Sequence, residues 1–220
     1  MIIIGSWHKT GTVLLSTIFE ILHKLENKQF TYKTYINFSQ CTDEEIKHNK
    51  CIVVIRHPYE IICSGVRYHE HSKEKWLHEK QTCYNNKSYQ EMIQSFDTDN
   101  KILFEMKQCA RNNIFNIYND MKNRNNNNNI LFVPLEDLTD PTKMAEICDK
   151  IIRHISSETY VFTYDNIMRA IQTSMHLNKD HRTNTDNTIT YRNYFKDEHY
   201  TEFKKIFPED LFATIGYNHI

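Results

Sequence analysis

Short apolar runs along the chain alternate with longer stretches whose apolar residues recur every three or four positions. The chain is expected to form strands near residues 2–5, 31–36, 51–55 and 130–133. The longer stretches predict helices near residues 12–25, 59–68, 100–122, 142–154, 164–172 and 197–206. Because strands that alternate with helices pair as a parallel sheet, this pattern predicts an α/β fold with its ligand site at the carboxyl ends of the strands.

The turn after the first predicted strand holds the first candidate chemistry. Its sequence, GSWHKTGT at residues 5–12, places Lys9 and Gly11 directly before a predicted helix. Backbone N–H groups and the dipole at a helix start attract an anion, and Lys9 adds a full positive charge. The turn therefore predicts a phosphate or sulfate site, with an ordinary helix cap as the alternative. The spacing differs from the G-x-x-x-x-G-K-[ST] loop of nucleotide triphosphatases, because Lys9 precedes Gly11.

A second candidate anion site follows the predicted strand at 51–55. Arg56 ends that strand, and Pro58 suits the first turn of the next helix, where no N–H partner is needed. Ser64 lies eight residues after Arg56. The two side chains are expected to converge on one anion, Arg56 as a fork and Ser64 as a neutral donor. The alternative is a local ion pair between Arg56 and Glu60.

Glycine is scarce in this chain. Of only four glycines, Gly5, Gly11 and Gly65 fall in the two candidate anion sites. Glycine is used where the backbone turns sharply or approaches a ligand closely. Its concentration here supports the functional interpretation of both segments.

The combination of KTGT after the first strand and R-x-P-x-x-x-x-x-S after a later one resembles the sulfotransferases that use 3′-phosphoadenosine 5′-phosphosulfate (PAPS). Residues 130–152 look like the family's strand that ends in Glu-Asp-Leu and the helix after it. Residues 181–207 are similar to the C-terminal segment that closes over the 3′-phosphate. The resemblance implies one sulfotransferase domain over residues 1–220, with a P-loop-like three-layer α/β/α fold around a central parallel sheet.

The resemblance also implies the cofactor and its contacts. The first loop would hold the 5′-phosphosulfate of PAPS and the second motif its 3′-phosphate, with 3′-phosphoadenosine 5′-phosphate (PAP) as the product. The residues implied are His8, Lys9, Thr10, Gly11, Thr12, Val13, Arg56, Ser64, Arg182 and Thr183.

Two departures from the family concern its aromatic and basic residues. The family loop usually ends Gly-Thr-Thr-Trp, whose aromatic lies near adenine, whereas residues 11–14 read GTVL. Trp7 is then a candidate to pack on adenine. The usual C-terminal Arg-Lys-Gly is replaced by Arg182-Thr183-Asn184, and Tyr191 is the nearest following aromatic.

The implied reaction is in-line sulfuryl transfer to a hydroxyl or amine. In such transfers the protein mainly positions the reactants and stabilises charge on the leaving oxygen. Lys9 is the candidate for that task. Glu136 and Asp137 are expected to orient the nucleotide loop, and no metal is required.

The general base is harder to assign from sequence. The family often places a histidine after its second strand, but residues 34–45 contain none. His69 and His71 are the candidates, because a neutral imidazole suits proton transfer near pH 7. Glu70 and His78 come next. The H-x-H at 69–71 lacks a second ligand pair, so no metal site is expected.

Composition limits the partners. The formal net charge of −1 gives no indication of nucleic acid or a membrane surface, and no run is apolar enough to span a membrane. Six cysteines without a CxxC pair are typical of reduced thiols, which favours a cytoplasmic protein. Residues 68–100 are predicted to form a lid over a small-molecule or glycan acceptor, and the asparagine-rich run at 123–129 a surface loop. The sequence gives neither the acceptor nor the oligomeric state.

Two other functions remain open at this stage. A nucleoside or small-molecule kinase on a related scaffold would bind ATP and need Mg²⁺. A degenerate nucleotide-binding module, suggested by Val13, Leu14 and the altered Arg182 segment, would bind PAP without turnover.

Overall fold

The computed structural model describes residues 1–157, 161–177 and 190–217. They form two compact units. We call the first, Met1–His57 with the described part of Asn119–Arg182, the sheet unit. The second, Pro58–Tyr118 with the described part of Thr183–Ile220, is the helical unit.

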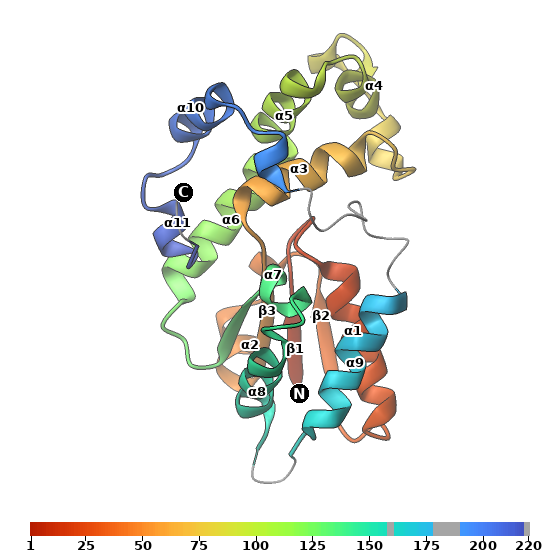
Figure 1. The fold of residues 1–220 in the computed structure, drawn as a ribbon, viewed down its shortest axis with the longest axis vertical. Helices are drawn as coiled ribbons and strands as arrows, with labels where there is room; N and C mark the ends of the chain where they lie inside the picture. The colour runs from red at the N-terminus through yellow and green to blue at the C-terminus, as the bar shows by residue number, and fades with distance from the viewer. Residues whose placement is uncertain (158–160, 178–189, 218–220) are drawn as a thin grey trace. The chain divides into compact units, whose positions relative to one another are not determined.

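The sheet unit is built on four parallel strands in the order β2-β1-β3-β6 (Figure 1). They are β1 (Ile2–Gly5), β2 (Tyr32–Tyr35), β3 (Lys50–Ile55) and β6 (Ile130–Pro134). In this register Ile4 lies between Thr34 on one side and Ile52 on the other. All four strands are where the sequence predicts them, and the α/β fold with a central parallel sheet is confirmed.

Five of the six predicted helices are found close to their expected bounds. They are α1 (Thr12–Leu25), α3 (Pro58–His69), α8 (Met144–Ile155), α9 (Tyr164–Leu177) and α10 (Asp197–Ile206). The single helix predicted near 100–122 is wrong, because α5 (Thr98–Lys107) and α6 (Cys109–Arg124) are separated at Gln108. Buried residues at 102, 106, 110, 114 and 117 continue the helical spacing across that break, so the pattern does not reveal it.

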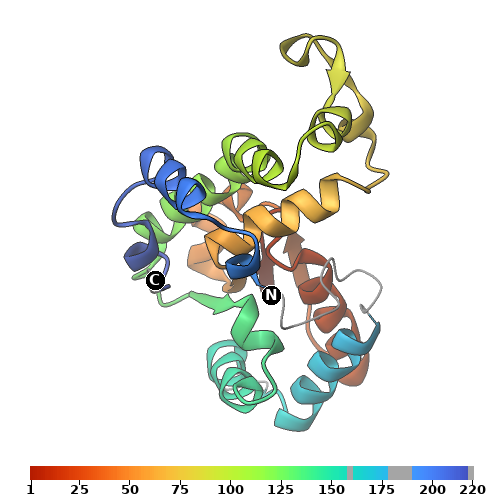
Figure 2. The same ribbon diagram turned by 45° about the horizontal axis from the view of Figure 1, so that its top comes forward.

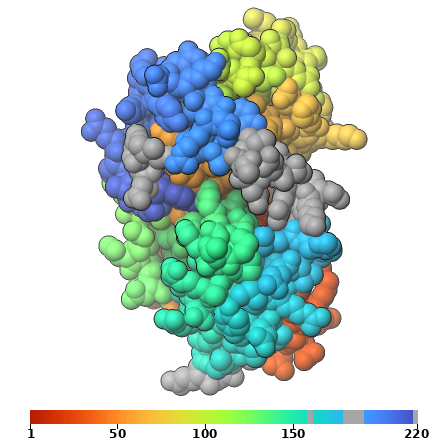
Figure 3. Space-filling view, in the orientation of Figure 1, coloured from red at the N-terminus to blue at the C-terminus, as the bar shows by residue number. Residues whose placement is uncertain are grey.

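One face of the sheet is covered by α1, α8 and α9. Alternate strand residues, Ile4 and Ile52 among them, join one apolar cluster with buried residues of these three helices. Helices α1 and α9 run side by side in Figure 1 and Figure 2. On the surface of the sheet unit, α8 and α9 lie next to each other (Figure 3), and Met144, Met168 and Met175 line a groove between them.

The opposite face of the sheet is also buried. Ile3 and Val53, which alternate with the residues of the first face, are wholly inaccessible. Phe38 of the short helix η1 (Phe38–Gln40) lies on this side, directly beneath Gly5. Burial on both faces explains why the central strands are apolar throughout, as in other parallel sheets.

Short elements without long periodicity were not predicted. They are α2 (Asp43–His48), α4 (Tyr89–Gln94), α7 (Leu135–Thr139), α11 (Leu211–Thr214), β4 (Lys80–Gln81) and β5 (Lys87–Ser88). Two begin with a capping box, in which Thr42 and Ser88 each exchange hydrogen bonds with a glutamate three residues on. The predicted lid region, residues 68–100, contains α4 and the β4–β5 pair.

The helical unit packs around aromatic residues. Tyr59 of α3 is buried, with the rings of Tyr191, Phe195, Phe203 and Phe212 at centroid distances of 4.7–5.2 Å. Helix α5 packs against both α3 and α10. Because aromatic pairs bury large areas, this cluster fixes α3 against the C-terminal segment of the chain.

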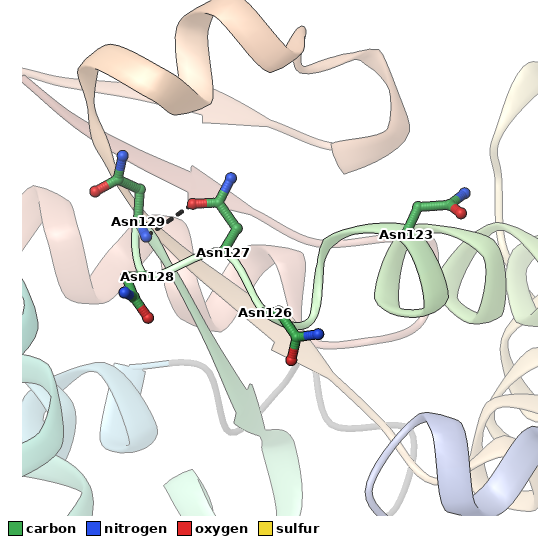
Figure 4. Close-up of a pocket in the computed structure, with 5 residues that line it drawn as sticks. All are labelled: Asn123, Asn126, Asn127, Asn128 and Asn129. Carbon is green, nitrogen blue, oxygen red and sulfur yellow. Dashed lines mark hydrogen bonds between the residues drawn. The ribbon is translucent and has the colours of Figure 1, made fainter.

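The asparagine-rich run forms the turn that leads into β6. Five asparagine side chains line an open pocket there (Figure 4). Asn129 donates its backbone N–H to the Asn127 side chain at 2.9 Å and its own amide to the carbonyls of Ile46 and Lys47. These bonds tie the loop to the residues before β3, which is a structural role.

No helix in the described part of the chain combines the length and apolar character needed to cross a membrane. The six cysteines are free thiols, and Cys41, Cys51, Cys63 and Cys148 are buried.

Gly5 leaves no room for a side chain. A Cβ there would lie 2.4 Å from Cδ2 and 2.9 Å from Cγ of the buried Phe38 ring. We expect Gly5→Ala to lower the free energy of unfolding by about 1–3 kcal/mol, the usual cost of overpacking, in urea denaturation. Adding Phe38→Leu should recover part of this loss. Strict additivity of the two changes would contradict the steric explanation.

Candidate functional site

The loop between β1 and α1 turns through two left-handed residues. Lys9 has a φ of 65° and Gly11 a φ of 102°. A side chain at Gly11 would be strained and would also place its Cβ 2.8 Å from Leu135 Cδ1. Glycine is therefore required at the N-cap of α1, and Lys9 accepts a conformation that side chains seldom adopt.

Hydroxyl groups brace this loop from inside. The wholly buried Thr10 hydroxyl accepts the backbone N–H of Trp7 and donates to the Trp7 carbonyl, each at 2.8 Å. Ser6 donates to the Thr12 hydroxyl at 2.8 Å. Thr10, which the resemblance assigns to the cofactor, thus uses its side chain to hold the loop.

The start of α1 provides the donors for an anion. No side chain caps the helix at Gly11, and its first turn contains no acidic residue. The first N–H groups of a helix have no intrahelical acceptor, so those of Thr12 and Val13 are directed at whatever lies before the helix. Val13 is 51% exposed, so this end of α1 lies at the surface.

Arg56 is attached to the loop. Its Nη1 donates to the carbonyl oxygen of Lys9 at 3.1 Å. The next backbone N–H, that of His57, donates to Glu136 Oε1 of α7 at 3.1 Å. The two predicted anion-binding segments of the sheet unit therefore meet, and Glu136 holds the second in place. In the helical unit, Glu60 accepts the backbone N–H of Tyr191 at 2.7 Å.

The expectation that Trp7 packs on adenine is wrong. Its side chain is wholly buried, with the ring edge-on to Phe38 at 5.8 Å. The indole N–H donates to Ser39 at 3.1 Å, and Ser39 donates to Asp120 at 2.6 Å. Trp7 belongs to the core behind the loop, where no nucleotide base reaches it.

His69 is part of a buried polar group in the helical unit. Its Nδ1 lies 2.8 Å from Glu105 Oε2, and the Tyr89 hydroxyl donates to the same oxygen at 2.8 Å. All three side chains are at least 97% buried. Burial and the adjacent carboxylate raise the pKa of Tyr89, so it remains a donor at any physiological pH.

Gly65 allows this arrangement. A Cβ at position 65 would lie 2.3 Å from Glu105 Oε1, so only glycine lets the carboxylate approach α3. Neither Glu105 nor Tyr89 was expected from the sequence. They lie 36 and 20 residues from His69, with no motif that connects them.

The other candidate bases are more accessible than His69. The His71 side chain is 78% accessible and lies 3.9 Å from Glu70. Glu70 pairs with Lys101 at 2.7 Å, and His78 is also exposed.

Among the residues expected to bind the cofactor, Ser64 is buried on α3. Arg182 and Thr183 lie outside the described residues.

One group of potential metal ligands in the helical unit is already engaged. Ligand atoms of Asp99, Glu198 and His199 lie within 4.8 Å of one another. However, His199 Nδ1 accepts the Lys196 N–H at 2.9 Å, and its Nε2 donates to the Asp99 carbonyl at 3.2 Å. The Lys196 ammonium also pairs with the Asp99 carboxylate. These contacts fit a cap for α10 better than an ion site.

No family model and no curated protein matches the sequence. Among solved structures, that of mouse sulfotransferase SULT7A1 complexed with PAP is similar, with a TM-score of 0.55 and 14% identity. The match covers 99% of this chain and 88% of that one. The chain has a sulfotransferase-like fold. At this level of identity the likeness concerns the fold alone.

The bracing role of Thr10 is testable without a ligand. Thr10→Val keeps the shape but removes the partner of two buried backbone groups of Trp7. We expect a loss of about 1–3 kcal/mol in unfolding free energy, the cost of leaving a buried polar group unsatisfied. Thr10→Ser should restore most of this free energy of unfolding, and urea denaturation measures it for both variants. The control Thr17→Val, at an exposed hydroxyl bonded to Val13, should change stability little. Equal effects at both positions would contradict the role.

Proposed function

We propose that this protein is a PAPS-dependent sulfotransferase. The observation that carries the proposal is the hydrogen bond from Arg56 to the Lys9 carbonyl. It joins the KTGT loop to the start of the R-x-P motif, 47 residues away in sequence. A sulfotransferase-like fold supports the same assignment.

The loop at the start of α1 would receive the 5′-phosphosulfate. The N–H groups of Gly11, Thr12 and Val13 and the Lys9 ammonium supply donors and positive charge. Arg56 and Ser64 would bind the 3′-phosphate, with Arg182 and Thr183 as further candidates from the resemblance.

The proposed step is metal-independent and in line. The bond from sulfur to the bridging phosphate oxygen breaks as a bond from sulfur to the acceptor oxygen or nitrogen forms. Lys9 stabilises the negative charge that develops on the leaving phosphate oxygen of PAP. The acceptor loses its proton to a general base.

His69 is our candidate base, with His71 as the alternative. The Nδ1 of His69 lies 2.8 Å from the Glu105 carboxylate, which would accept a hydrogen bond from a protonated Nδ1 and hold the ring in one orientation. A base held by a carboxylate has the orientation that general-base catalysis needs. His71 is exposed, and its Nε2 lies 3.9 Å from Glu70, too far for a hydrogen bond that would orient the ring.

The acceptor is proposed to be a small molecule or glycan carrying a hydroxyl or amine. Free thiols, four of them buried, favour a reducing compartment such as the cytoplasm.

Thermal-shift titration with PAP, and with ATP in the presence and absence of Mg²⁺, tests the cofactor. PAP at about 100 times its dissociation constant should add about 2.7 kcal/mol, a shift of several degrees for a domain of this size. The shift should not depend on metal and should weaken in Arg56→Ala. Stabilisation only by Mg-ATP would favour a kinase. PAP binding without turnover would favour an inactive module.

Lys9→Ala should reduce sulfuryl transfer by about 10²–10³-fold, the usual loss for one preorganised donor, while PAP still binds. The readout is transfer of radiolabelled sulfate from PAPS to an acceptor found by screening. Lys28→Ala is the matched control, because Lys28 also has a left-handed backbone, with a φ of 59°. Unchanged turnover in Lys9→Ala would contradict its assignment.

Glu105→Gln tests the orientation of His69. In ¹⁵N-histidine-labelled protein, the signal lost in His69→Asn should report a ring that carries a proton at Nδ1. Glu105→Gln should weaken this preference and lower kcat more than KM. Glu70→Gln should alter the His71 signal and leave that of His69 unchanged. A His69 ring protonated at Nε2 would contradict its role as a base held by Glu105.

A further inference from the structure

Helix α3 presents two different polar faces within the helical unit. Gly65 and His69, four residues apart, share the face that meets Glu105. Glu60, Ser64 and Arg67, spaced by four and three residues, share another. The C-terminal segment lies along this second face, because Tyr191 donates to Glu60 and Tyr194 lies near Arg67. The proposed function uses Ser64 on this face but leaves Arg67 without a role.

Arg67 is a buried cation without an acceptor. Its Nε, Nη1 and Nη2 atoms are all buried and make no hydrogen bond in the described part of the chain. The guanidinium carbon lies 5.8 Å from the centroid of the Tyr194 ring. The residue as a whole is only partly buried, so its flexible stem reaches toward the surface.

This arrangement is costly for the unliganded protein. A guanidinium keeps its charge at any accessible pH, so it cannot avoid the cost of burial by losing a proton. An unpaired buried charge destabilises a fold by several kcal/mol, according to the usual estimates. The nearby acids Glu60 and Glu70 accept from Tyr191 and Lys101 instead. An external anion would supply the missing acceptor.

We propose that Arg67 binds the 3′-phosphate of the nucleotide together with Ser64 and thereby selects 3′-phosphorylated nucleotides. This inference rests on the proposed function, which assigns the 3′-phosphate to Ser64. Side chains three residues apart on a helix have Cβ atoms about 5–6 Å from each other, a separation that one phosphate group bridges. A guanidinium packed on an aromatic ring keeps its edge donors for two phosphate oxygens.

The role fits the departure of this chain from the family at its C-terminal motif. Where the family has a lysine after the arginine, residue 183 is threonine. Arg67 would add a positive charge at the 3′-phosphate from helix α3, one turn after Ser64.

Isothermal titration with PAP and with adenosine 5′-monophosphate tests the selection, since the two ligands differ only in the 3′-phosphate. Arg67→Gln should weaken PAP binding by about 10- to 100-fold, as expected for a lost charged hydrogen bond, and leave the monophosphate unchanged. Arg67→Lys should recover part of the affinity. Arg111→Gln is the matched control, because Arg111 also lies 5.8 Å from an aromatic ring, that of Phe115, but is exposed.

A second measurement separates this inference from the proposed function. Inorganic phosphate should raise the Tm of the wild type and not that of Arg67→Gln. If PAP fails to bind but phosphate still acts through Arg67, the proposed cofactor is wrong and Arg67 serves another phosphorylated ligand, which overturns the 3′-phosphate assignment. If Arg67→Gln leaves both titrations unchanged, the inference is overturned while PAP binding stands.

The unliganded protein provides a further check. Arg67→Met should raise the Tm by about 2–4 °C while PAP affinity falls, because the buried charge is removed. A purely structural arginine would give the opposite result, a lower Tm and unchanged selectivity between PAP and the monophosphate.

Discussion

The candidate site depends on one backbone constraint, the six residues that connect the end of β1 at Gly5 to the start of α1 at Thr12. Within this length the chain must leave a buried strand and direct its first helical N–H groups outward. The left-handed turns at Lys9 and Gly11 make this possible, and the Thr10 hydroxyl and the Arg56 guanidinium hold them. The donors for an anion are therefore fixed before any ligand arrives, which is how preorganised sites lower the cost of binding.

The sequence predicts those parts of the fold that local pattern determines. Strands buried on both faces appear as continuous apolar runs, and long amphipathic helices keep their spacing. The break at Gln108 escapes detection because buried residues on both sides continue one stripe. Short helices such as α2 also escape, since six residues hold too few turns to establish a period. Two of these short helices, α2 and α4, begin with capping boxes, which are a signal that can be found in the sequence.

The site residues also divide into those that local pattern predicts and those that tertiary packing determines. Lys9, Gly11 and Arg56 stand in short motifs, so the sequence alone predicts them as candidates for an anion site. Trp7 failed as an adenine partner because its burial depends on Phe38 and Ser39, more than thirty positions away. Glu105 meets His69 only because two helices pack closely at a glycine. Contacts of this kind arise from tertiary packing and leave no periodic trace.

Helix α3 carries two buried polar contacts that lower the stability of the fold. One face buries a carboxylate against His69, and the other buries the Arg67 guanidinium. Two such groups would be poor choices if stability alone mattered, because apolar replacements of similar volume are often more stable. The carboxylate is satisfied by His69 and Tyr89, whereas the guanidinium makes no hydrogen bond in the described residues. The two groups therefore have different effects on the unliganded protein. A satisfied polar group orients its neighbours, and an unsatisfied one raises the free energy of the empty state until a complementary charge binds.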